Sequence, residues 1–218
     1  CHALADANWH VVRDGRTHLM RATPIRLGQQ FRGYATQLTE AADRVREAFD
    51  HCRALPLGGT AVGTGIGCPP GLAAAVCDEI TRRFGLQVHE NANHLGVQGG
   101  LDRITWLVAA VRSAGTTLYK IVADLRLQAS DMLGELTMPA LQPGSSIMPG
   151  KTNPVVCEAA LMACAQLYGN DAVVAFANSQ GQFELNTMLP IVAHNALEAV
   201  LLLAGAAEVL ARHGLEGL

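Results

Sequence analysis

The sequence predicts an all-α protein, a bundle of long helices, and three observations favour this fold class. Aromatic residues make up only 5% of the 218 residues, while Ala, Leu and Val are abundant, a composition that suits helices better than strands. Apolar residues recur at spacings of three and four over long stretches, as on one face of a helix. Half of the residues are apolar, which is enough for a sizeable core. We therefore expect one helical domain over residues 1–218.

The first long helix is predicted from Thr23 to about Cys52. Thr23 followed by Pro24 is typical of an N-cap and the first position of a helix. The apolar residues that follow alternate between spacings of three and four, a mean period of 3.5 that is typical of helices packed side by side. They are Leu27, Phe31, Tyr34, Leu38, Ala41, Val45, Phe49 and Cys52.

The remaining chain predicts four more helices, one short and three long, separated by irregular stretches, and no convincing strand. Gly and Pro are too frequent in residues 56–71 for a regular element. In chain order we expect a loop at 56–71, a short helix at about 72–84 before Gly85, a long helix at about 98–128, an irregular stretch at 129–152, a third long helix from Asn153-Pro154 to about Ala177, and a fourth from Asn186 or Thr187 to His213, with Pro190 in its first turn and Gly214 as its stop.

Charge and composition exclude several function classes. The formal net charge of −3 and the scattered basic residues do not predict a nucleic-acid partner. The six cysteines form no C-x-x-C pair, which suits free thiols in a reducing cytoplasm, and the histidines show no H-x-x-x-H pair, so we expect no metal site. The longest apolar stretch, Val200–Ala207, is too short to cross a membrane. Both chain ends, Cys1 and Leu218, are interpreted as those of a fragment.

The stretch that most clearly indicates a functional site is residues 144–154, Gly-Ser-Ser-Ile-Met-Pro-Gly-Lys-Thr-Asn-Pro. Gly144 and Gly150 provide bends that let a loop close and open. Asn153 marks a helix start, where free backbone N–H groups and the helix dipole favour an anion such as a carboxylate. Taken alone, these residues are equally typical of a cap, a solvated Lys151 and ordinary loop serines.

The eleven residues match the signature GSSxMPxKxNP of the fumarase and aspartase superfamily. Further matching stretches are Gly15–Met20 (GRTHLM), Ala22–Pro24, Leu27–Phe31 (LGQQF), Gly58–Gly65 (GGTAVGTG) and Gly181–Asn186 (GQFELN). The chain therefore resembles the central helical region of a class II fumarase. The resemblance implies a long-helix bundle that assembles into a homotetramer, with each active site built from three subunits and with the N-terminal and C-terminal regions of the family apparently absent here.

The implied reaction is the reversible hydration of fumarate to L-malate, a step of the tricarboxylic acid cycle, through an aci-carboxylate intermediate. Fixed hydrogen-bond donors stabilise such an intermediate, so no cofactor is implied. By motif position Ser145 corresponds to the catalytic base, acting as an alkoxide. Ser146 would help to hold the intermediate, and Lys151 and Asn153 match the ligands of the substrate carboxylate.

A second group of implied site residues lies outside the loop. Thr17 and His18, in the Gly-Arg-Thr-His stretch, match a pair that contacts the substrate. Glu158 matches the acid that orients the histidine, although an acid one turn into a helix is equally explained by the helix dipole. Taken alone, His18 would be an ordinary histidine.

Two alternatives to fumarate hydration stay open. Gly33-Tyr34, Gly58-Gly59, Gly150, Cys157 and Phe183-Glu184 resemble fumarase choices, whereas Val155-Val156 resembles an aspartate ammonia-lyase. Substrate choice is also affected by a short connection at Asp131-Met132 and by an Asn91–Asp102 stretch that departs from the family pattern. The other alternative is a catalytically silent helical assembly fragment, and we expect these residues alone to assemble but to catalyse poorly.

Overall fold

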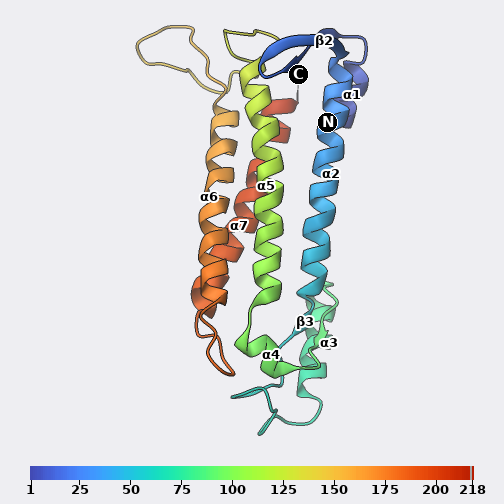
Figure 1. Cartoon of the computed structure of the whole chain (residues 1–218), viewed down its shortest axis with the longest axis vertical. Helices are drawn as coiled ribbons and strands as arrows, with labels where there is room; N and C mark the ends of the chain where they lie inside the picture. The colour runs from blue at the N-terminus through green and yellow to red at the C-terminus, as the bar shows by residue number, and fades with distance from the viewer. Residues whose placement is uncertain (217) are drawn as a thin grey trace. The chain divides into compact units, whose positions relative to one another are not determined.

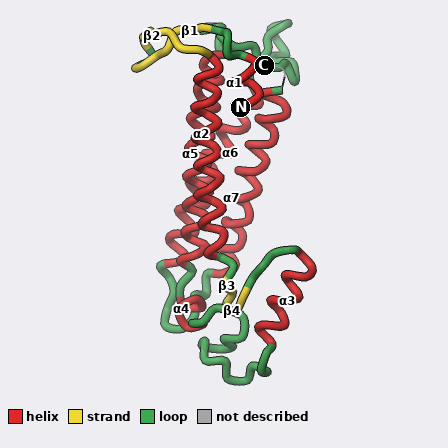
Figure 2. Tube along the Cα trace, turned by 90° about the vertical axis from the view of Figure 1, so that its right-hand side faces the viewer, coloured by secondary structure: helices red, strands yellow, loops and turns green. Residues whose placement is uncertain are grey.

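A computed structural model describes residues 1–216 and 218 of the chain, mostly as α-helices (Figures 1 and 2). The prediction of an all-α, long-helix protein is confirmed. The elements are α1 (His2–Ala7), β1 (Val12–Thr17), β2 (Met20–Arg26), α2 (Leu27–His51), β3 (Ala54–Leu55), α3 (Leu72–Phe84), β4 (His89–Glu90), α4 (His94–Gly99), α5 (Asp102–Gln128), α6 (Val155–Asn178), α7 (Leu189–Leu210) and the π-helical turn η1 (Ala211–Leu215).

The chain packs as two compact units, each assembled from several segments. Unit 1 comprises Cys1–Asp43, Ala114–Cys164 and Ala204–Leu218, and unit 2 comprises Arg44–Ser113 and Ala165–Leu203. Their boundaries fall inside α2, α5, α6 and α7 rather than in a linker. The assignment of residues 1–218 to one domain, with family regions missing on either side, stays a prediction.

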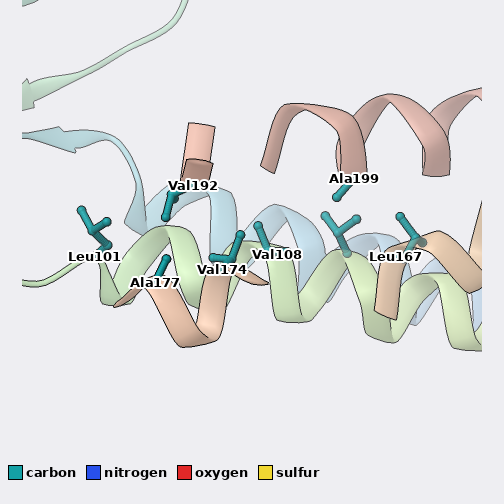
Figure 3. Close-up of a cluster of buried hydrophobic side chains, with 8 residues drawn as sticks. Leu101, Val108, Leu167, Val174, Ala177, Val192 and Ala199 are labelled. Carbon is teal, nitrogen blue, oxygen red and sulfur yellow. The ribbon is translucent and has the colours of Figure 1, made fainter. Parts of the chain in front are cut away.

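The core of unit 2 lies where parts of α5, α6 and α7 meet (Figure 3). Val108, Leu167 and Val174 are almost completely inaccessible to solvent, and each such side chain contributes roughly 1.5–3 kcal/mol through burial. The other buried members of the cluster are Leu101, Val111, Ala177, Val192 and Ala199. Apolar residues at helical spacing therefore form this core, as the sequence predicts.

The core of unit 1 joins α1 to the beginning of α2 and the end of α5. Phe31, Ile121 and Leu125 are fully buried there, together with Ala5, Leu27 and Tyr34. The helices α1 and α2 approach closely at Gly28, where a Cβ atom would lie 2.4 Å from the carbonyl oxygen of Ala5. This close packing fixes the start of α2, from which the preceding hairpin extends.

The expectation that Thr23-Pro24 opens the first long helix is wrong, as is the expectation of no strands. Both residues lie in β2, which pairs antiparallel with β1 and places Pro24 opposite Asp14. Pro is tolerated here because a two-stranded sheet has only edge strands. The helix begins instead at Leu27, where the side chain of Gln29 accepts a hydrogen bond from the backbone N–H of Arg26 at 2.9 Å, half of a capping box.

The predicted helix over residues 98–128 is two helices, because the chain is extended at Gly100 between α4 and α5. Asn178, the last residue of α6, holds this break. Its Oδ1 accepts a hydrogen bond from the backbone N–H of Leu101 at 2.6 Å, and its Nδ2 donates to Asp102 at 3.0 Å. Asp102 in the first turn also favours a helix start.

Most of the other predicted boundaries are confirmed within a few residues. Residues 56–71 and 129–152 contain no regular element, and α3 ends before Gly85, which is left-handed with a φ of 66°. The last helix begins at Leu189 rather than at Asn186, because the buried Asn186 side chain bonds to the backbone of Met188 in a turn before it. Pro190 lies in its first turn as predicted.

Two helical segments, Val155–Asn178 and Leu189–Leu215, are long and apolar enough by length and composition to cross a membrane. In their most apolar windows, only 28% and 22% of the residues are buried. Length and composition alone are weak evidence, since the core helices of bundles meet the same criteria. The expectation of no membrane segment stays a prediction.

Candidate active site

The turn between β1 and β2 carries Thr17 and His18. The two central residues of the turn, His18 and Leu19, both adopt left-handed backbone conformations, with φ angles of 54° and 62°. Two-residue hairpin turns require this geometry and favour Asn or Gly, whose backbones adopt it most readily. Thr17 and His18 are exposed, so this turn presents two polar side chains to any ligand or partner.

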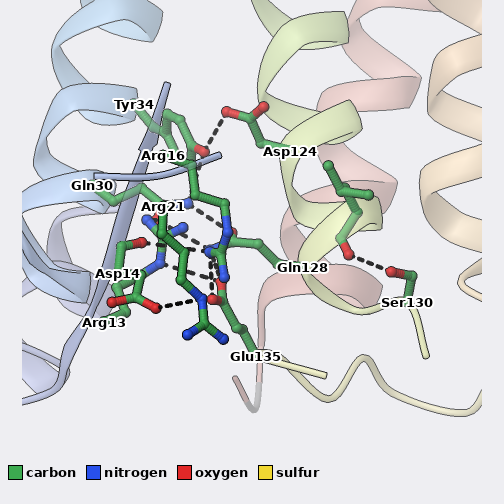
Figure 4. Close-up of polar contacts among 11 residues, drawn as sticks. Arg13, Asp14, Arg16, Arg21, Gln30, Tyr34, Asp124, Gln128, Ser130 and Glu135 are labelled. Atoms are coloured by element: carbon green, nitrogen blue, oxygen red, sulfur yellow. Dashed lines mark hydrogen bonds and ion pairs between the residues drawn. The ribbon is translucent and has the colours of Figure 1, made fainter. Parts of the chain in front are cut away.

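Behind the turn, β1 contains a bulge around Gly15. Residues three apart in a regular strand point to opposite faces, but the bulge changes the alternation and lets Arg13 and Arg16 reach the same carboxylate. Nε of Arg13 lies 3.3 Å from Oε2 of Glu135, and Nη1 of Arg16 lies 2.5 Å from Oε1 (Figure 4). Gly15 is required because a Cβ atom there would lie 2.5 Å from the carbonyl oxygen of Thr23.

Glu135 is also connected to α2 and α5 by a chain of polar side chains (Figure 4). Nε2 of Gln128 donates to Glu135 at 3.2 Å, and Nε2 of Gln30 donates to Gln128 at 2.7 Å and to the Tyr34 hydroxyl at 2.8 Å. The Tyr34 hydroxyl donates in turn to Asp124 at 2.8 Å. Burial and this hydrogen bond raise the pKa of Tyr34, which keeps the phenol protonated as a donor.

The charge state of Glu135 follows from competing effects. Burial raises the pKa of its carboxyl group, but the hydrogen bonds from Arg16 and Gln128 and the charges of Arg13 and Arg16 outweigh burial and lower the pKa below the usual value of 4.5. Glu135 is therefore a carboxylate at neutral pH and binds both arginines through charge-assisted hydrogen bonds.

An open cavity of about 750 Å³ lies beside this network, and His18 forms part of its wall. Three cations, Arg13, Arg16 and Lys120, line it together with Asp124. The arginines are paired with Glu135, and Lys120 is paired with Asp124 at 2.5 Å. The charges in the cavity wall are thus largely compensated.

The loop of residues 144–153 is closed at its base by two hydrogen bonds. The backbone N–H of Gly144 donates to the carbonyl oxygen of Lys151 at 2.7 Å, and Nδ2 of Asn153 donates to the carbonyl oxygen of Gly144 at 3.1 Å. A Cβ atom on Gly144 would lie 2.7 Å from that Lys151 oxygen. The motif therefore needs Gly and Asn at these positions to hold its own loop together.

Ser145 has a distinct environment at the start of this loop. Its Oγ accepts hydrogen bonds from the backbone N–H groups of Ile147 at 3.1 Å and Met148 at 3.0 Å. Hydrogen bonds to the charged form of a group favour that form, so two N–H donors favour an ionised hydroxyl. Ser146 and Lys151 are exposed, while Ser145 is half-buried.

Glu158 lies in the first turn of α6, where the helix dipole favours an acid. Its Oε1 lies 3.0 Å from Nη2 of Arg126 on α5. Within residues 1–216 and 218, no hydrogen bond or ion pair joins Glu158 to His18, or either of them to Ser145. One chain thus joins Gly144 to the backbone of Lys151 and to the side chain of Asn153 in the loop that carries Ser145, whereas Thr17 and His18 lie on the separate hairpin turn.

A metal centre needs several His, Cys, Asp or Glu side chains close together. Residues 1–216 and 218 contain no group of three or more His, Cys, Asp or Glu side chains that could hold a metal ion.

Comparison with known proteins decides the family. The sequence matches the protein family described as lyase over residues 2–169. The chain belongs to this lyase family.

Two relatives with curated names are fumarate hydratases. The chain is 47% identical over 212 residues to a class II fumarate hydratase of Corynebacterium efficiens, and 44% identical over 211 residues to one of Methanosarcina acetivorans. These matches cover 95% of the chain in both cases, but only 45% and 44% of the relatives. The crystal structure of a class II fumarase from Schistosoma mansoni superposes with a TM-score of 0.94 at 32% identity, covering 99% of this chain and 49% of that one. The chain therefore spans about half the length of the relatives that it matches.

Sequence reasoning missed the residues behind the hairpin turn, above all Glu135 and Gln128. No motif marks them in the way that the serine loop is marked. A signal was available in Arg13 and Arg16, two cations flanking a glycine in a strand-length segment. The segment has no apolar alternation, however, so its pattern does not predict a strand.

Proposed function

We propose that the natural protein containing this chain is a fumarate hydratase, which adds water reversibly to fumarate to give L-malate. The observation that carries the proposal is the environment of Ser145, whose Oγ receives two backbone N–H groups inside a loop that matches the superfamily signature. The similarity to class II fumarate hydratases over 95% of the chain supports the same reaction.

In the direction of malate dehydration, we assign proton abstraction to Ser145. Its alkoxide, stabilised by the two N–H donors, takes a proton from the carbon next to a carboxylate of L-malate. The electron pair moves into that carboxylate to give the aci-carboxylate. It then forms the double bond as the hydroxyl group on the neighbouring carbon takes up a proton and leaves as water.

The charge of the intermediate needs donors that are in place before the reaction. Lys151 and Asn153 supply a cation and an amide N–H next to Ser145, and Ser146 with the loop N–H groups supplies others. Asn153 already has its amide held against Gly144, which keeps it oriented. No cofactor enters this proposal, because fixed donors stabilise the negative charge.

Thr17, His18 and Glu158 complete the proposed site from other copies of the chain. In a single chain Thr17 and His18 do not contact Ser145, and Glu158 pairs with Arg126. A homotetramer in which three subunits contribute to each site resolves this separation. Glu158 would then orient a His18 ring from another copy, and His18 would exchange the proton of the departing water.

Exposed apolar side chains on the two most apolar helices support self-association. Met162 and Phe176 on α6 are 68% and 66% exposed, and Leu197 and Leu201 on α7 are 66% and 71% exposed. Faces of this kind mark interaction surfaces, and copies of the same bundle helices offer matching ones. All six cysteines are unpaired, which supports a location in the reducing cytoplasm.

The test follows the absorbance of the fumarate double bond after L-malate or L-aspartate is added to the natural protein. A rise with L-malate alone supports the proposal, and the Ser145→Ala variant should abolish it. A rise with L-aspartate alone would replace the proposal with an aspartate ammonia-lyase. No rise with either substrate, in protein that is folded and tetrameric, would contradict both and favour a silent assembly protein.

A further inference from the structure

The turn that carries His18 holds an unfavourable backbone conformation. His18 and Leu19 have φ angles of 54° and 62°, in a region that side chains with a Cβ atom rarely adopt. Such a conformation persists only where the surrounding structure holds it in place. Both residues are exposed, so their own side chains do not hold the turn. The pairing of Thr17 with Met20 and of Arg16 with Arg21 closes it at its base.

A second restraint acts on the residue just before the turn. Arg16 directly precedes Thr17, and Glu135 binds its guanidinium group. Glu135 also binds the guanidinium group of Arg13, on the other side of the bulge. The side chains of Arg16 and Glu135 are only 16% and 19% exposed, so water competes little for these bonds. We call Arg13, Arg16, Glu135 and Gln128 the hairpin clamp.

Glu135 is itself fixed at both its backbone and its side chain. Its backbone N–H donates to the carbonyl oxygen of Gln128 at 2.8 Å, and the Gln128 side chain donates to its carboxylate at 3.2 Å. Gln128 is 3% exposed and ends α5. The clamp therefore attaches the hairpin to a long helix.

We propose that Glu135 is a positioning residue for Thr17 and His18, which holds the strained turn through Arg16. This proposal rests on the proposed function, because it assumes that Thr17 and His18 contact the substrate. Loss of the Glu135 charge would let Arg16 move and the turn relax toward commoner backbone angles. The two side chains would then leave the geometry that the reaction needs, where a displacement of about 1 Å can cost roughly 100-fold in rate.

The main test is the Glu135→Gln variant of the natural protein, which keeps the shape of the side chain and removes its charge. We expect kcat/KM for fumarate to fall by roughly 10- to 100-fold. The matched control is Asp171→Asn. Asp171 is also 19% exposed and is paired with Arg112 at 2.6 Å, and its loss should leave kcat/KM within about twofold of wild type, as for a remote site. Equal losses in both variants would overturn the proposal.

A double-mutant cycle separates positioning from general destabilisation. If Glu135 acts through the turn, Glu135→Gln should cost little further activity in a His18→Ala background, because the group it positions is already absent. Fully additive effects of the two substitutions would contradict the proposal. If Glu135→Gln does not fold, Arg16→Lys replaces it, since lysine keeps the charge but loses the planar guanidinium contacts and should give a smaller loss of the same kind.

A third measurement does not depend on the reaction. Hydrogen exchange of the peptide spanning residues 14–22 should be faster in Glu135→Gln than in wild type, and unchanged in Asp171→Asn. If the wild-type protein hydrates no fumarate, the proposed function fails while this measurement still tests the clamp. If exchange in residues 14–22 is unchanged by Glu135→Gln, the clamp does not hold the turn and the proposal is wrong.

Discussion

Glu158 pairs with Arg126 across α6 and α5, with 3.0 Å between Oε1 and Nη2. The two side chains are 37% and 49% exposed, so the pair is open to water and to a competing partner. An ion pair of this kind contributes at most about 1 kcal/mol to stability. The carboxylate is therefore placed by a weak contact, and in the proposed assembly it can exchange Arg126 for the histidine of another copy.

Separate substitutions at the two ends of this pair should have different effects. Glu158→Gln should lower kcat roughly 10- to 100-fold or more, because a histidine acting as acid or base depends on its orienting carboxylate, and should shift the pH profile of kcat. Arg126→Gln should change the free energy of unfolding by less than about 1 kcal/mol and should retain most activity. Steady-state kinetics between pH 6 and 9, with denaturant unfolding as the second readout, make the comparison. Equal kinetic losses in both variants would show that Arg126, rather than a histidine, is the functional partner.

Removing the Ser145 hydroxyl should abolish turnover without unfolding the protein. We expect kcat of Ser145→Ala to fall by roughly 10²- to 10⁴-fold, the range for losing a general base, with the thermal midpoint nearly unchanged because the loop is largely exposed. Single-turnover absorbance measurements at saturating L-malate check the rate. The Ser146→Ala variant is the comparison, since a supporting donor should matter less than the base. A Ser145→Ala enzyme with normal kcat would remove Ser145 from the mechanism.

The base of the serine loop should not tolerate a methyl group. In Gly144→Ala the new Cβ atom would lie 2.7 Å from the carbonyl oxygen of Lys151, so the loop must open or shift, at a cost of about 1–3 kcal/mol. Activity should fall because Lys151 and Asn153 move with it. Gly96→Ala is the control, because a Cβ atom at Gly96 in α4 would lie 3.9 Å from the Asn93 side chain, an ordinary van der Waals distance, and Ala favours a helix by about 0.5–1 kcal/mol. Enzyme kinetics and thermal unfolding make the comparison: Gly144→Ala should be less active and less stable than wild type, whereas the control should be as active and at least as stable.

A charge on the exposed face of α7 should disrupt assembly. Leu201 is 71% exposed in the chain, and in the proposed tetramer it is covered by another copy, where an unpaired carboxylate is strongly unfavourable. Leu201→Asp should therefore sediment as a species smaller than the wild-type tetramer and lose activity with it. Phe84→Asp, at a residue that is 75% exposed at the end of α3, should leave sedimentation unchanged. A tetrameric Leu201→Asp protein would place the interface elsewhere.

The Glu135 carboxylate should make stability depend on pH in a defined direction. Its pKa is lowered in the folded protein, so its contribution is fully present above the pKa of the unfolded chain and is lost as the pH falls through the lower, folded value. At pH 7 Glu135→Gln should be less stable than wild type, and the difference should shrink as the pH falls below about 4.5. Urea unfolding at a series of pH values measures this. A difference that grows toward low pH would contradict the assigned direction.

The sequence predicts the helical part of this fold well, because its signals are local and repeated. The 3.5-residue apolar spacing from Leu27 to Cys52 corresponds to α2, and Asn153-Pro154 correctly marks the start of α6. The hairpin before α2 was missed because β1 carries Arg, Asp and Gly rather than alternating apolar residues, and because Thr23-Pro24 is also a good helix start. Its strands are held by pairing and by Glu135, a contact more than a hundred residues away in the chain, which no local pattern contains.

The residues of the candidate site likewise fall into those that a local motif predicts and those that depend on tertiary packing. Ser145, Lys151 and Asn153 lie within nine residues, so the motif alone predicts that they act together. The position of Glu158 beside Arg126 and the clamp behind His18 depend on which helices meet, and the spacing of the residues along the chain does not determine that. A sequence motif thus predicts the reacting groups, whereas the contacts that would support them come from tertiary packing.

The bulge around Gly15 also constrains how this region can evolve. Deleting one residue between Arg13 and Arg16 would leave the two arginines on one face of a regular strand, but it would shift the pairing of part of β1 with β2 by one residue. An insertion would move the turn relative to the strand end. Substitutions at exposed positions of the hairpin other than Thr17 and His18 should be accepted freely, but changes in its length should not. A library of single-codon deletions and insertions across residues 12–26 should therefore lose nearly all of its members under selection for function.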